Sequence, residues 1–307
     1  MSKVAFIFPG QGAQYVGMGQ DFYENCETAK KVYETASRVT GIDVAALCFE
    51  ENEKLNITEY TQLAMLTTEV AILSVLEEKG VKADACAGLS LGEYGAIAAA
   101  KVMNQEDLFK VIRQRGLFMQ EAYPSGGAMT AVLGMETEKI AEICENTPGI
   151  VSIANYNCPG QIVITGAKEA VDQAAEALLQ AGAKRCIPLQ VSGPFHSALL
   201  SDAGKKLGKC LEEITVKNPE IPYVCNVDAT YVTTAENIKN LLEKQVSSSV
   251  CWQQSMEQMI ADGFDTFIEI GPGKTLTGFM KKIDKSVKVM NIAKIDDLEK
   301  VLEEIAC

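Results

Sequence analysis

The sequence has a single histidine and a single tryptophan, and none of its ten cysteines forms a C-x-x-C pair. Zinc sites are usually built from several cysteines and histidines at short spacings, so this composition excludes a zinc centre. Cys86, Cys186 and Cys225 stand in apolar runs, where a thiol packs as a small hydrophobic group. Reduced, structural thiols of this kind indicate a cytoplasmic protein.

Positive charge and long apolar runs are also scarce. The chain has 28 Lys+Arg against 41 Asp+Glu, and this net charge of −13 argues against a general nucleic-acid binder. No apolar stretch approaches the roughly 20 residues needed to cross a bilayer, so we expect no membrane partner. The N-terminal run MSKVAFIFP is too short for a secretory signal and predicts a buried first strand.

Strand-like and helix-like segments alternate along the chain, which predicts the α/β class. The expected elements of the first part are strands at 3–8 and 83–87 and helices at 61–79, 91–101 and 107–120. After residue 127 the order changes to β-α-β-β-α-β, the ferredoxin-like pattern. The sequence therefore predicts a small domain at 126–191, inserted into a larger α/β body formed by 1–125 and 192–307.

The segment Gly88-Leu89-Ser90-Leu91-Gly92 has the form G-x-S-x-G and lies between an expected strand and an expected helix. A nucleophile elbow requires this context, because its serine sits on a sharp turn and its small neighbours let strand and helix approach. The serine oxygen then faces the free N–H groups of a helix N-terminus, which stabilise an oxyanion. Ser90 is therefore a candidate nucleophile, and a tight turn that only packs the helix is the alternative.

A serine nucleophile needs a base that titrates near neutral pH, and His196 is the single histidine of the chain. His196 stands in a Gly-Pro loop, 192–197, where functional residues tend to lie. Lone histidines are more often structural, so this role depends on Ser90 being a nucleophile. Arg115 falls on an expected helix among apolar neighbours, and the residues alone favour a solvated or ion-paired arginine there.

Two glycine-rich segments approach nucleotide-binding motifs and fail the test of spacing. The loop at 8–14 contains Gly10 and Gly12, but the dinucleotide fingerprint needs a third glycine where Tyr15 stands. The segment 271–275 resembles the end of a phosphate loop, but Ile268 occupies the position of its upstream glycine. We expect a structural turn at 271–275, while the loop at 8–14 can supply a backbone N–H beside Ser90.

Six segments occur together in the order and spacing of one enzyme family. They are Phe8-Pro9-Gly10-Gln11-Gly12-Ala13-Gln14, Gly88-Leu89-Ser90-Leu91-Gly92-Glu93-Tyr94, Arg115-Gly116 with Met119-Gln120, Asn155-Tyr156-Asn157 with Pro159-Gly160-Gln161, Gly193-Pro194-Phe195-His196-Ser197, and Glu269-Ile270-Gly271-Pro272-Gly273. From about residue 3 to 285 the chain resembles the malonyl-CoA:acyl carrier protein transacylases of bacterial type II fatty-acid synthesis. The resemblance implies an α/β-hydrolase-like large domain with an inserted ferredoxin-like small domain.

The resemblance implies roles for the candidate residues. Ser90 is the nucleophile and His196 its base, and the backbone N–H groups of Gln11 and Leu91 form the oxyanion hole. Arg115 binds the free carboxylate of the malonyl group, which replaces the interpretation of Arg115 as a solvated or ion-paired residue.

Three further positions border the substrate or the base in the family. Met119 lies at the substrate, and Phe195 before His196 is similar to the pattern of malonyl-selective enzymes. Cys251 stands where the family usually has Gln or Asn, and the resemblance implies that its backbone carbonyl orients His196. Leu89 stands where the family often has histidine, a side chain that the chemistry does not need.

The implied partners are malonyl-CoA and acyl carrier protein, with no cofactor and no metal. The carrier is acidic in this family, and so is this chain, so a local basic patch must favour docking; Lys281 and Lys282 are the candidates. The alternatives are a polyketide-pathway acyltransferase, a serine thioesterase or hydrolase, and a degenerate acyl-binding module. The sequence does not fix the oligomeric state, and a monomer is the expectation.

Overall fold

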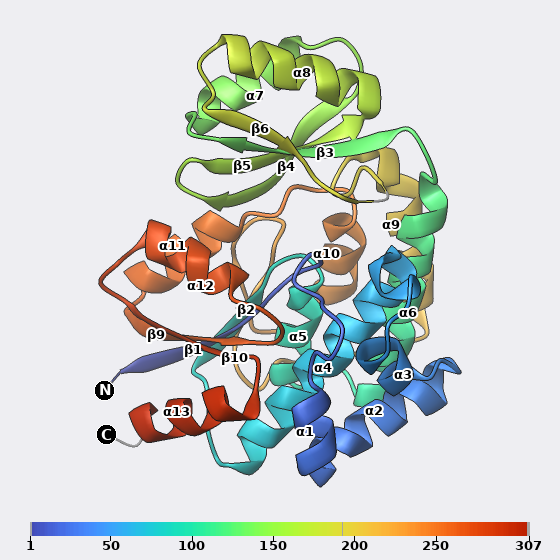
Figure 1. Cartoon of the computed structure of the whole chain (residues 1–307), viewed down its shortest axis with the longest axis vertical. Helices are drawn as coiled ribbons and strands as arrows, with labels where there is room; N and C mark the ends of the chain where they lie inside the picture. The colour runs from blue at the N-terminus through green and yellow to red at the C-terminus, as the bar shows by residue number, and fades with distance from the viewer. Residues whose placement is uncertain (1, 192, 306–307) are drawn as a thin grey trace.

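The computed structural model describes residues 2–191 and 193–305. Ser192, where the expected second half of the larger body begins, lies outside the described residues, as do Met1, Ala306 and Cys307. The strands are β1 (Lys3–Phe8), β2 (Ala85–Gly88), β3 (Gly127–Leu133), β4 (Val151–Cys158), β5 (Gln161–Ala167), β6 (Arg185–Pro188), β7 (Tyr223–Val224), β8 (Tyr231–Val232), β9 (Phe264–Ile270) and β10 (Lys288–Ile292). They form two sheets, one in each of the two layers that Figure 1 shows one above the other.

Helices surround both sheets, and those expected at 61–79, 91–101 and 107–120 form with shifted ends as α4, α5 and α6. The helices are α1 (Gln20–Asn25), α2 (Glu27–Thr40), α3 (Val44–Phe49), α4 (Thr58–Glu78), α5 (Gly92–Ala99), α6 (Gln105–Ala122), α7 (Thr137–Asn146), α8 (Lys168–Gln180), α9 (Ser201–Glu212), α10 (Ile238–Gln245), α11 (Trp252–Ala261), α12 (Thr275–Ile283) and α13 (Ile295–Ile305), with single 3-10 turns at Lys54–Asn56 and Ala198–Leu200. No helix in the described ranges combines the length and the apolar character needed to span a membrane.

The larger sheet has the strand order β10-β9-β1-β2-β7-β8, and its pairs are parallel except β7 with β8. Because β1 lies in the middle, its side chains are buried on both faces. Phe6 and Phe8 pack with the cluster of α2, α4, α5 and α6, whereas Ala5 and Ile7 pack with Trp252 and the apolar residues of α11 and α12. The carboxyl ends of β1 and β2 lead into the segments that hold Gln11 and Ser90, so the parallel pairing brings these segments together.

The smaller sheet is antiparallel, with the order β4-β5-β3-β6, and its elements follow the expected β-α-β-β-α-β sequence. The helices α7 and α8 cover its outer face, visible at the top of Figure 1, through a core that includes Ile140, Ile164 and Leu178. The other face turns Met129 and Val163 toward the larger body, where they join its main core. The fold is thus an α/β-hydrolase-like body with a ferredoxin-like insertion.

A backbone bridge fixes the smaller sheet to the larger body. Val250, just before α11, forms a parallel bridge with Asn155 of β4 through hydrogen bonds with the neighbouring residues Ala154 and Tyr156. The Ser249 hydroxyl also donates to the Ile153 carbonyl at 2.6 Å. These contacts hold β4 beside the segment 245–250, which borders the site described next.

Candidate active site

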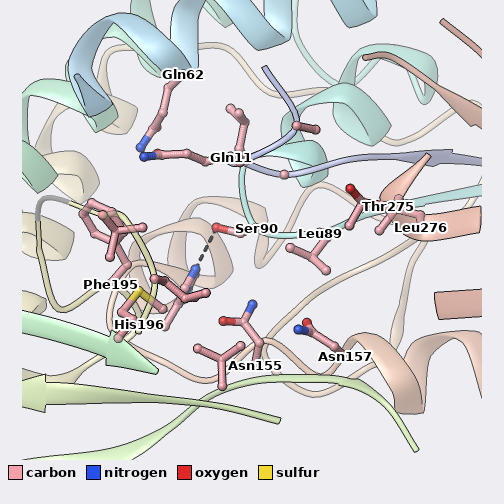
Figure 2. A pocket seen from close by; sticks show the side chains of 18 of the residues that line it. Gln11, Gln62, Leu89, Ser90, Asn155, Asn157, Phe195, His196, Thr275 and Leu276 are labelled. Carbon is pink, nitrogen blue, oxygen red and sulfur yellow. Dashed lines mark hydrogen bonds between the residues drawn. The ribbon is translucent and has the colours of Figure 1, made fainter. Parts of the chain in front are cut away.

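A cavity of about 210 Å³ lies between the two sheets. Its walls contain Gln11, Ser90, Leu91, Arg115, Met119, Phe195 and His196, so residues far apart in the sequence meet there. The smaller sheet contributes Met129, Asn155, Asn157 and Val163, and the start of α12 contributes Thr275, Leu276 and Phe279. Figure 2 shows Ser90 and His196 facing each other, with Asn155 and Asn157 on one side and Gln11 and Gln62 on the other.

The turn between β2 and α5 holds Ser90 in a left-handed conformation with φ 55°. Both glycines of the G-x-S-x-G segment are required by close approach of the backbone. A Cβ at Gly88 would lie 1.9 Å from the Gly92 carbonyl oxygen, and a Cβ at Gly92 would lie 2.1 Å from that of Phe8. The segment is therefore a nucleophile elbow in geometry, with a strained serine presented at the end of a central strand.

Ser90 Oγ and His196 Nε2 are 2.7 Å apart. His196 Nδ1 lies 3.0 Å from the carbonyl oxygens of Gln245 and Ser248. Because a carbonyl only accepts, Nδ1 carries the proton, and Nε2 accepts from the Ser90 hydroxyl. Burial, followed by the nearby positive charge of Arg115, lowers the pKa of His196 to about 4, so the imidazole is neutral and ready to take a proton.

The expected role of Cys251 is wrong, because other carbonyls hold the histidine. The Cys251 carbonyl accepts from the Ser255 hydroxyl and backbone N–H, and its thiol donates to the Val227 carbonyl. Cys251 begins the α11 segment, so its carbonyl points along that helix. The acceptors for His196 come from the end of α10 and the loop that follows it.

Arg115 projects from α6 and is only 1 % exposed, so the reading as a solvated residue is wrong. Its Nη1 donates to Gln62 Oε1 at 2.7 Å. Its Nη2 donates to Gln245 Oε1 at 3.0 Å and to Ser90 Oγ at 3.3 Å. All these acceptors are neutral, and the buried Nε has no partner in the described part of the chain. The cation is thus fixed beside the serine without an ion pair, and burial lowers its pKa.

Gln11 and Leu91 line the cavity near Ser90, and each has a backbone N–H that donates to no acceptor among the described residues. Leu91 immediately precedes α5, so its N–H is one of the free donors at a helix start. The Gln11 side chain is tied back, since its Nε2 donates to Thr58 Oγ1 at 3.1 Å. The two N–H groups are suited to an oxyanion that forms at Ser90.

The remaining expected residues fall in two places. Met119 and Phe195 line the cavity, and Met119 Sδ accepts from Gln62 Nε2 at 3.4 Å. Lys281 and Lys282 are exposed in the last turn of α12, outside the cavity wall. Lys282 Nζ donates to Gln161 Oε1 at 3.1 Å, a contact between the larger body and the smaller sheet.

Sequence reasoning missed three buried polar residues that surround the site. Asn226 Oδ1 accepts from the Ser90 N–H at 2.6 Å. Gln245 Oε1 accepts from Arg115, and Gln245 Nε2 donates to Glu93. Asn226 follows β7 closely, and a polar residue at the carboxyl end of a parallel strand is the signal that points to it. Gln245 carries no such signal, because it is a lone amide at the end of an amphipathic helix.

Comparison with known proteins agrees with this geometry. The acyl transferase domain family matches residues 5–299. The malonyl CoA-acyl carrier protein transacylase of Bacillus subtilis is 41 % identical over 310 residues, covering 99 % of this chain and 98 % of that protein. The solved malonyl CoA-acyl carrier protein transacylase of Clostridium perfringens has a TM-score of 0.96 and 46 % identity, covering 99 % and 98 % of the two chains.

A malonyl-transacylase solved in complex with a type II PKS acyl-carrier protein is similar at a TM-score of 0.96 and 40 % identity, covering 99 % of this chain and 100 % of that one. The likeness thus extends over both sheets and the cavity between them. With its nearly complete coverage by such relatives, the chain belongs to the acyl transferase domain family and, within it, to the malonyl CoA-acyl carrier protein transacylases.

Proposed function

We propose that this protein moves a malonyl group from malonyl-CoA to the phosphopantetheine thiol of acyl carrier protein through a malonyl ester on Ser90. One observation carries the proposal: a buried guanidinium that has no ion pair with any described residue lies 3.3 Å from the oxygen that contacts the single histidine. In malonyl-CoA the free carboxylate is two bonds from the thioester carbonyl. A substrate whose carbonyl reaches Ser90 therefore brings its carboxylate to Arg115.

In the acylation step, Ser90 Oγ attacks the thioester carbonyl carbon while its proton passes to His196 Nε2. The backbone N–H groups of Gln11 and Leu91 stabilise the tetrahedral oxyanion; loss of one such donor costs about 3–4 kcal/mol in other acyl-transfer enzymes. The C–S bond then breaks, and the CoA sulfur takes the proton from His196. The products are CoA and malonyl-Ser90.

The second step reverses the first with a different thiol. The pantetheine thiol of the carrier gives its proton to His196 Nε2 and attacks the malonyl ester, and Ser90 Oγ leaves and takes that proton back. Each step balances with groups already in the cavity, so the proposal includes no cofactor and no metal. Two carbonyl dipoles at Nδ1 stabilise the imidazolium, a role that a carboxylate has in many serine hydrolases.

Arg115 selects the substrate. A carboxylate that accepts two hydrogen bonds from one guanidinium is held in a fixed direction, and the unpartnered Nε–H is available for such a pair. An acetyl group leaves this buried cation unpaired, which disfavours it by about 10²-fold or more. Malonyl-CoA is therefore the donor that fits the site.

Acyl carrier protein of fatty-acid synthesis is the proposed acceptor, and a polyketide carrier is the alternative. Docking is proposed at Lys281 and Lys282, because α12 runs from the cavity wall at Thr275 to these exposed charges. Changing both to glutamate is expected to raise the KM for the carrier and to spare the KM for malonyl-CoA. An unchanged carrier KM would remove this docking site. Parallel assays with fatty-acid and polyketide carriers decide the pathway.

A cytoplasmic location is part of the proposal, because all nine cysteines in the described part of the chain are free, as is usual where thiols stay reduced. The whole proposal is tested by intact-mass measurement after mixing with malonyl-CoA. We expect a malonyl adduct that is absent from Ser90→Ala and is discharged by carrier protein. Rapid CoA release without an adduct would instead identify a thioesterase. The absence of both an adduct and CoA release would identify a binding module.

A further inference from the structure

Glu93 is a buried carboxylate that the reaction above does not use. It lies on the first turn of α5, three residues after Ser90, and is 1 % exposed. Its Oε2 accepts from the Gln245 side-chain Nε2 at 2.7 Å and from the Asn226 backbone N–H at 3.1 Å. Burial of a carboxylate is energetically unfavourable unless hydrogen bonds or nearby opposite charges stabilise it, so the contacts of Glu93 need an explanation.

The Gln245 side chain is a bridge between Glu93 and the candidate active site. Its Nε2 donates to Glu93 and also to the Ser90 carbonyl at 2.9 Å. The Ser90 carbonyl can only accept, as can Glu93 when ionised, so the nitrogen of the amide must face them and Oε1 must face Arg115. Oε1 accepts from Arg115 Nη2 at 3.0 Å. Without Glu93, the amide loses one of the two acceptors that fix this orientation.

Asn226 is a second bridge, to the nucleophile elbow. Its backbone N–H is held by Glu93, while its side-chain Oδ1 accepts from the Ser90 N–H at 2.6 Å and its Nδ2 donates to the Gly88 carbonyl at 2.7 Å. One carboxylate oxygen therefore supports both the strained turn at Ser90 and the guanidinium at Arg115.

We propose that Glu93 is a positioning residue for malonyl transfer, which holds Gln245 so that its amide oxygen fixes the Arg115 guanidinium toward the malonyl carboxylate. This inference rests on the proposed function. Glu93 touches neither the substrate nor the reacting atoms, and it acts through Gln245. Its main effect is therefore on the preference for malonyl over acetyl groups, because only the malonyl group uses Arg115.

The charge of Glu93 adds a dependence on pH. Burial raises the pKa of Glu93 to about 7, although hydrogen bonds from Gln245 and Asn226 and the charge of Arg115 act in the opposite direction. The titratable or charged groups that face it are Arg115, Asp228, Tyr94, Tyr223 and Cys225. When Glu93 is ionised, its negative charge partly neutralises the positive charge of Arg115 and repels the malonyl carboxylate. Malonyl binding therefore weakens as the pH rises through about 7. Acetyl binding does not weaken in this pH range, because the acetyl group has no carboxylate.

The test compares Glu93→Met, Glu93→Gln and Gln245→Met with the wild type, using single-turnover acylation by malonyl-CoA and by acetyl-CoA. Glu93→Met replaces the carboxylate by a weakly accepting thioether. We expect its kcat/KM for malonyl-CoA to fall by about 10²-fold, with a much smaller fall for acetyl-CoA. Glu93→Gln can place a carbonyl oxygen at the same two donors, and we expect it to recover most of the malonyl preference. The matched control is Glu138→Gln, an exposed carboxylate on α7, which leaves both rates unchanged.

The double variant Glu93→Met/Gln245→Met shows whether the effect passes through the amide. We expect the malonyl preference of the double variant to match that of Gln245→Met alone. If Glu93 acts only through Gln245, the effects of the two substitutions are not additive. A wild-type ratio of malonyl to acetyl rates in Glu93→Met overturns the proposal, as does full additivity in the double variant.

A second measurement covers the case in which Glu93→Met does not fold. The KM for malonyl-CoA is expected to rise with pH through about 7 in the wild type and to stay level in Glu93→Gln. Identical profiles in the two proteins contradict the proposal. Failure of the wild type to form any malonyl-Ser90 adduct refutes the proposed function instead, so the two failures are distinguishable.

Discussion

Replacing Arg115 by alanine separates recognition of the malonyl carboxylate from the chemistry at Ser90. The guanidinium is buried, 3.3 Å from Ser90 Oγ, and all its hydrogen bonds go to neutral groups. A malonyl carboxylate would therefore be the first charged group to accept hydrogen bonds directly from it. The alanine variant removes the guanidinium while leaving the contact between Ser90 and His196 in place.

The size of the effect follows from the hydrogen bonds lost. A bond to a charged group contributes about 1.5–3 kcal/mol, so a two-bond pair contributes about 3–6 kcal/mol. At about 1.4 kcal/mol per factor of ten, kcat/KM for malonyl-CoA should fall by about 10²- to 10⁴-fold. The variant also leaves the buried Oε1 atoms of Gln62 and Gln245 without this donor, which affects both substrates alike. The ratio of malonyl to acetyl rates should therefore fall by at least about 10²-fold.

The assay is acylation of Ser90 by malonyl-CoA and by acetyl-CoA, followed by intact mass in a single turnover. Lys110→Ala is the control, because Lys110 lies on the same helix, is exposed and pairs only with Asp107 among the described residues. It should leave both rates and their ratio unchanged. Equal losses on the two substrates in Arg115→Ala would show that the guanidinium supports the fold or the serine rather than the malonyl group.

Three other predictions concern the base, the elbow and the core. In Glu93→Gln, which removes the titration of Glu93, the acylation rate should depend on a single group with a pKa near 4 and should fall below that pH as His196 becomes protonated. A midpoint near the ordinary histidine value of 6.5 would show that burial does not lower the pKa of His196. Gly88→Ala should abolish folding or activity because its Cβ meets backbone, whereas Gly278→Ala in α12, with open space around it, should raise the melting temperature slightly; equal effects would refute the packing account. Burial, followed by the charge of Glu269, raises the pKa of Glu69 well above its usual value, so the folded state binds a proton that the unfolded state releases, and stability should fall by about 1.4 kcal/mol per pH unit from about pH 4.5 up to the folded pKa. Because the pKa values of Glu93 and Glu269 are also raised, denaturant titrations should show the contribution of Glu69 as a steeper fall of stability with pH in the wild type than in Glu69→Gln.

Local patterns were enough to predict the parts of the site that depend on one turn or one loop. The G-x-S-x-G segment predicted the strand, the turn and the helix around Ser90, since each glycine is required by a contact within a few residues or with the adjacent strand. The βαββαβ order was also predictable, because every strand and helix of 127–188 except the four-residue β6 is long enough to show its own periodicity. By contrast, β7 and β8 have two residues each and leave no periodic signal.

The longest helix shows a different limit of sequence reasoning. The apolar spacing at 61–79 predicted α4, but the spacing does not reveal that nearly all of this helix is buried on every side. Thr67, Thr68 and Glu69 therefore lie in the core, where the threonine hydroxyls bond to carbonyls one turn back. Arg115 was misread from its residues for the same reason, since burial of a charged side chain depends on packing between distant segments.

The anchoring of His196 has a consequence for how this protein tolerates mutation. A point mutation changes a side chain and cannot delete a main-chain oxygen, so substitutions at Gln245 or Ser248 leave both anchors of the imidazole in the chain. The base is instead vulnerable to changes in loop length between Gln245 and Ser248, because one inserted or deleted residue shifts the Ser248 oxygen relative to that of Gln245, which α10 holds. In a set of random variants, tolerance of substitution at Ser248 and intolerance of insertion between 245 and 248 should therefore occur together, whereas Gln245 stays sensitive because its side chain holds Arg115.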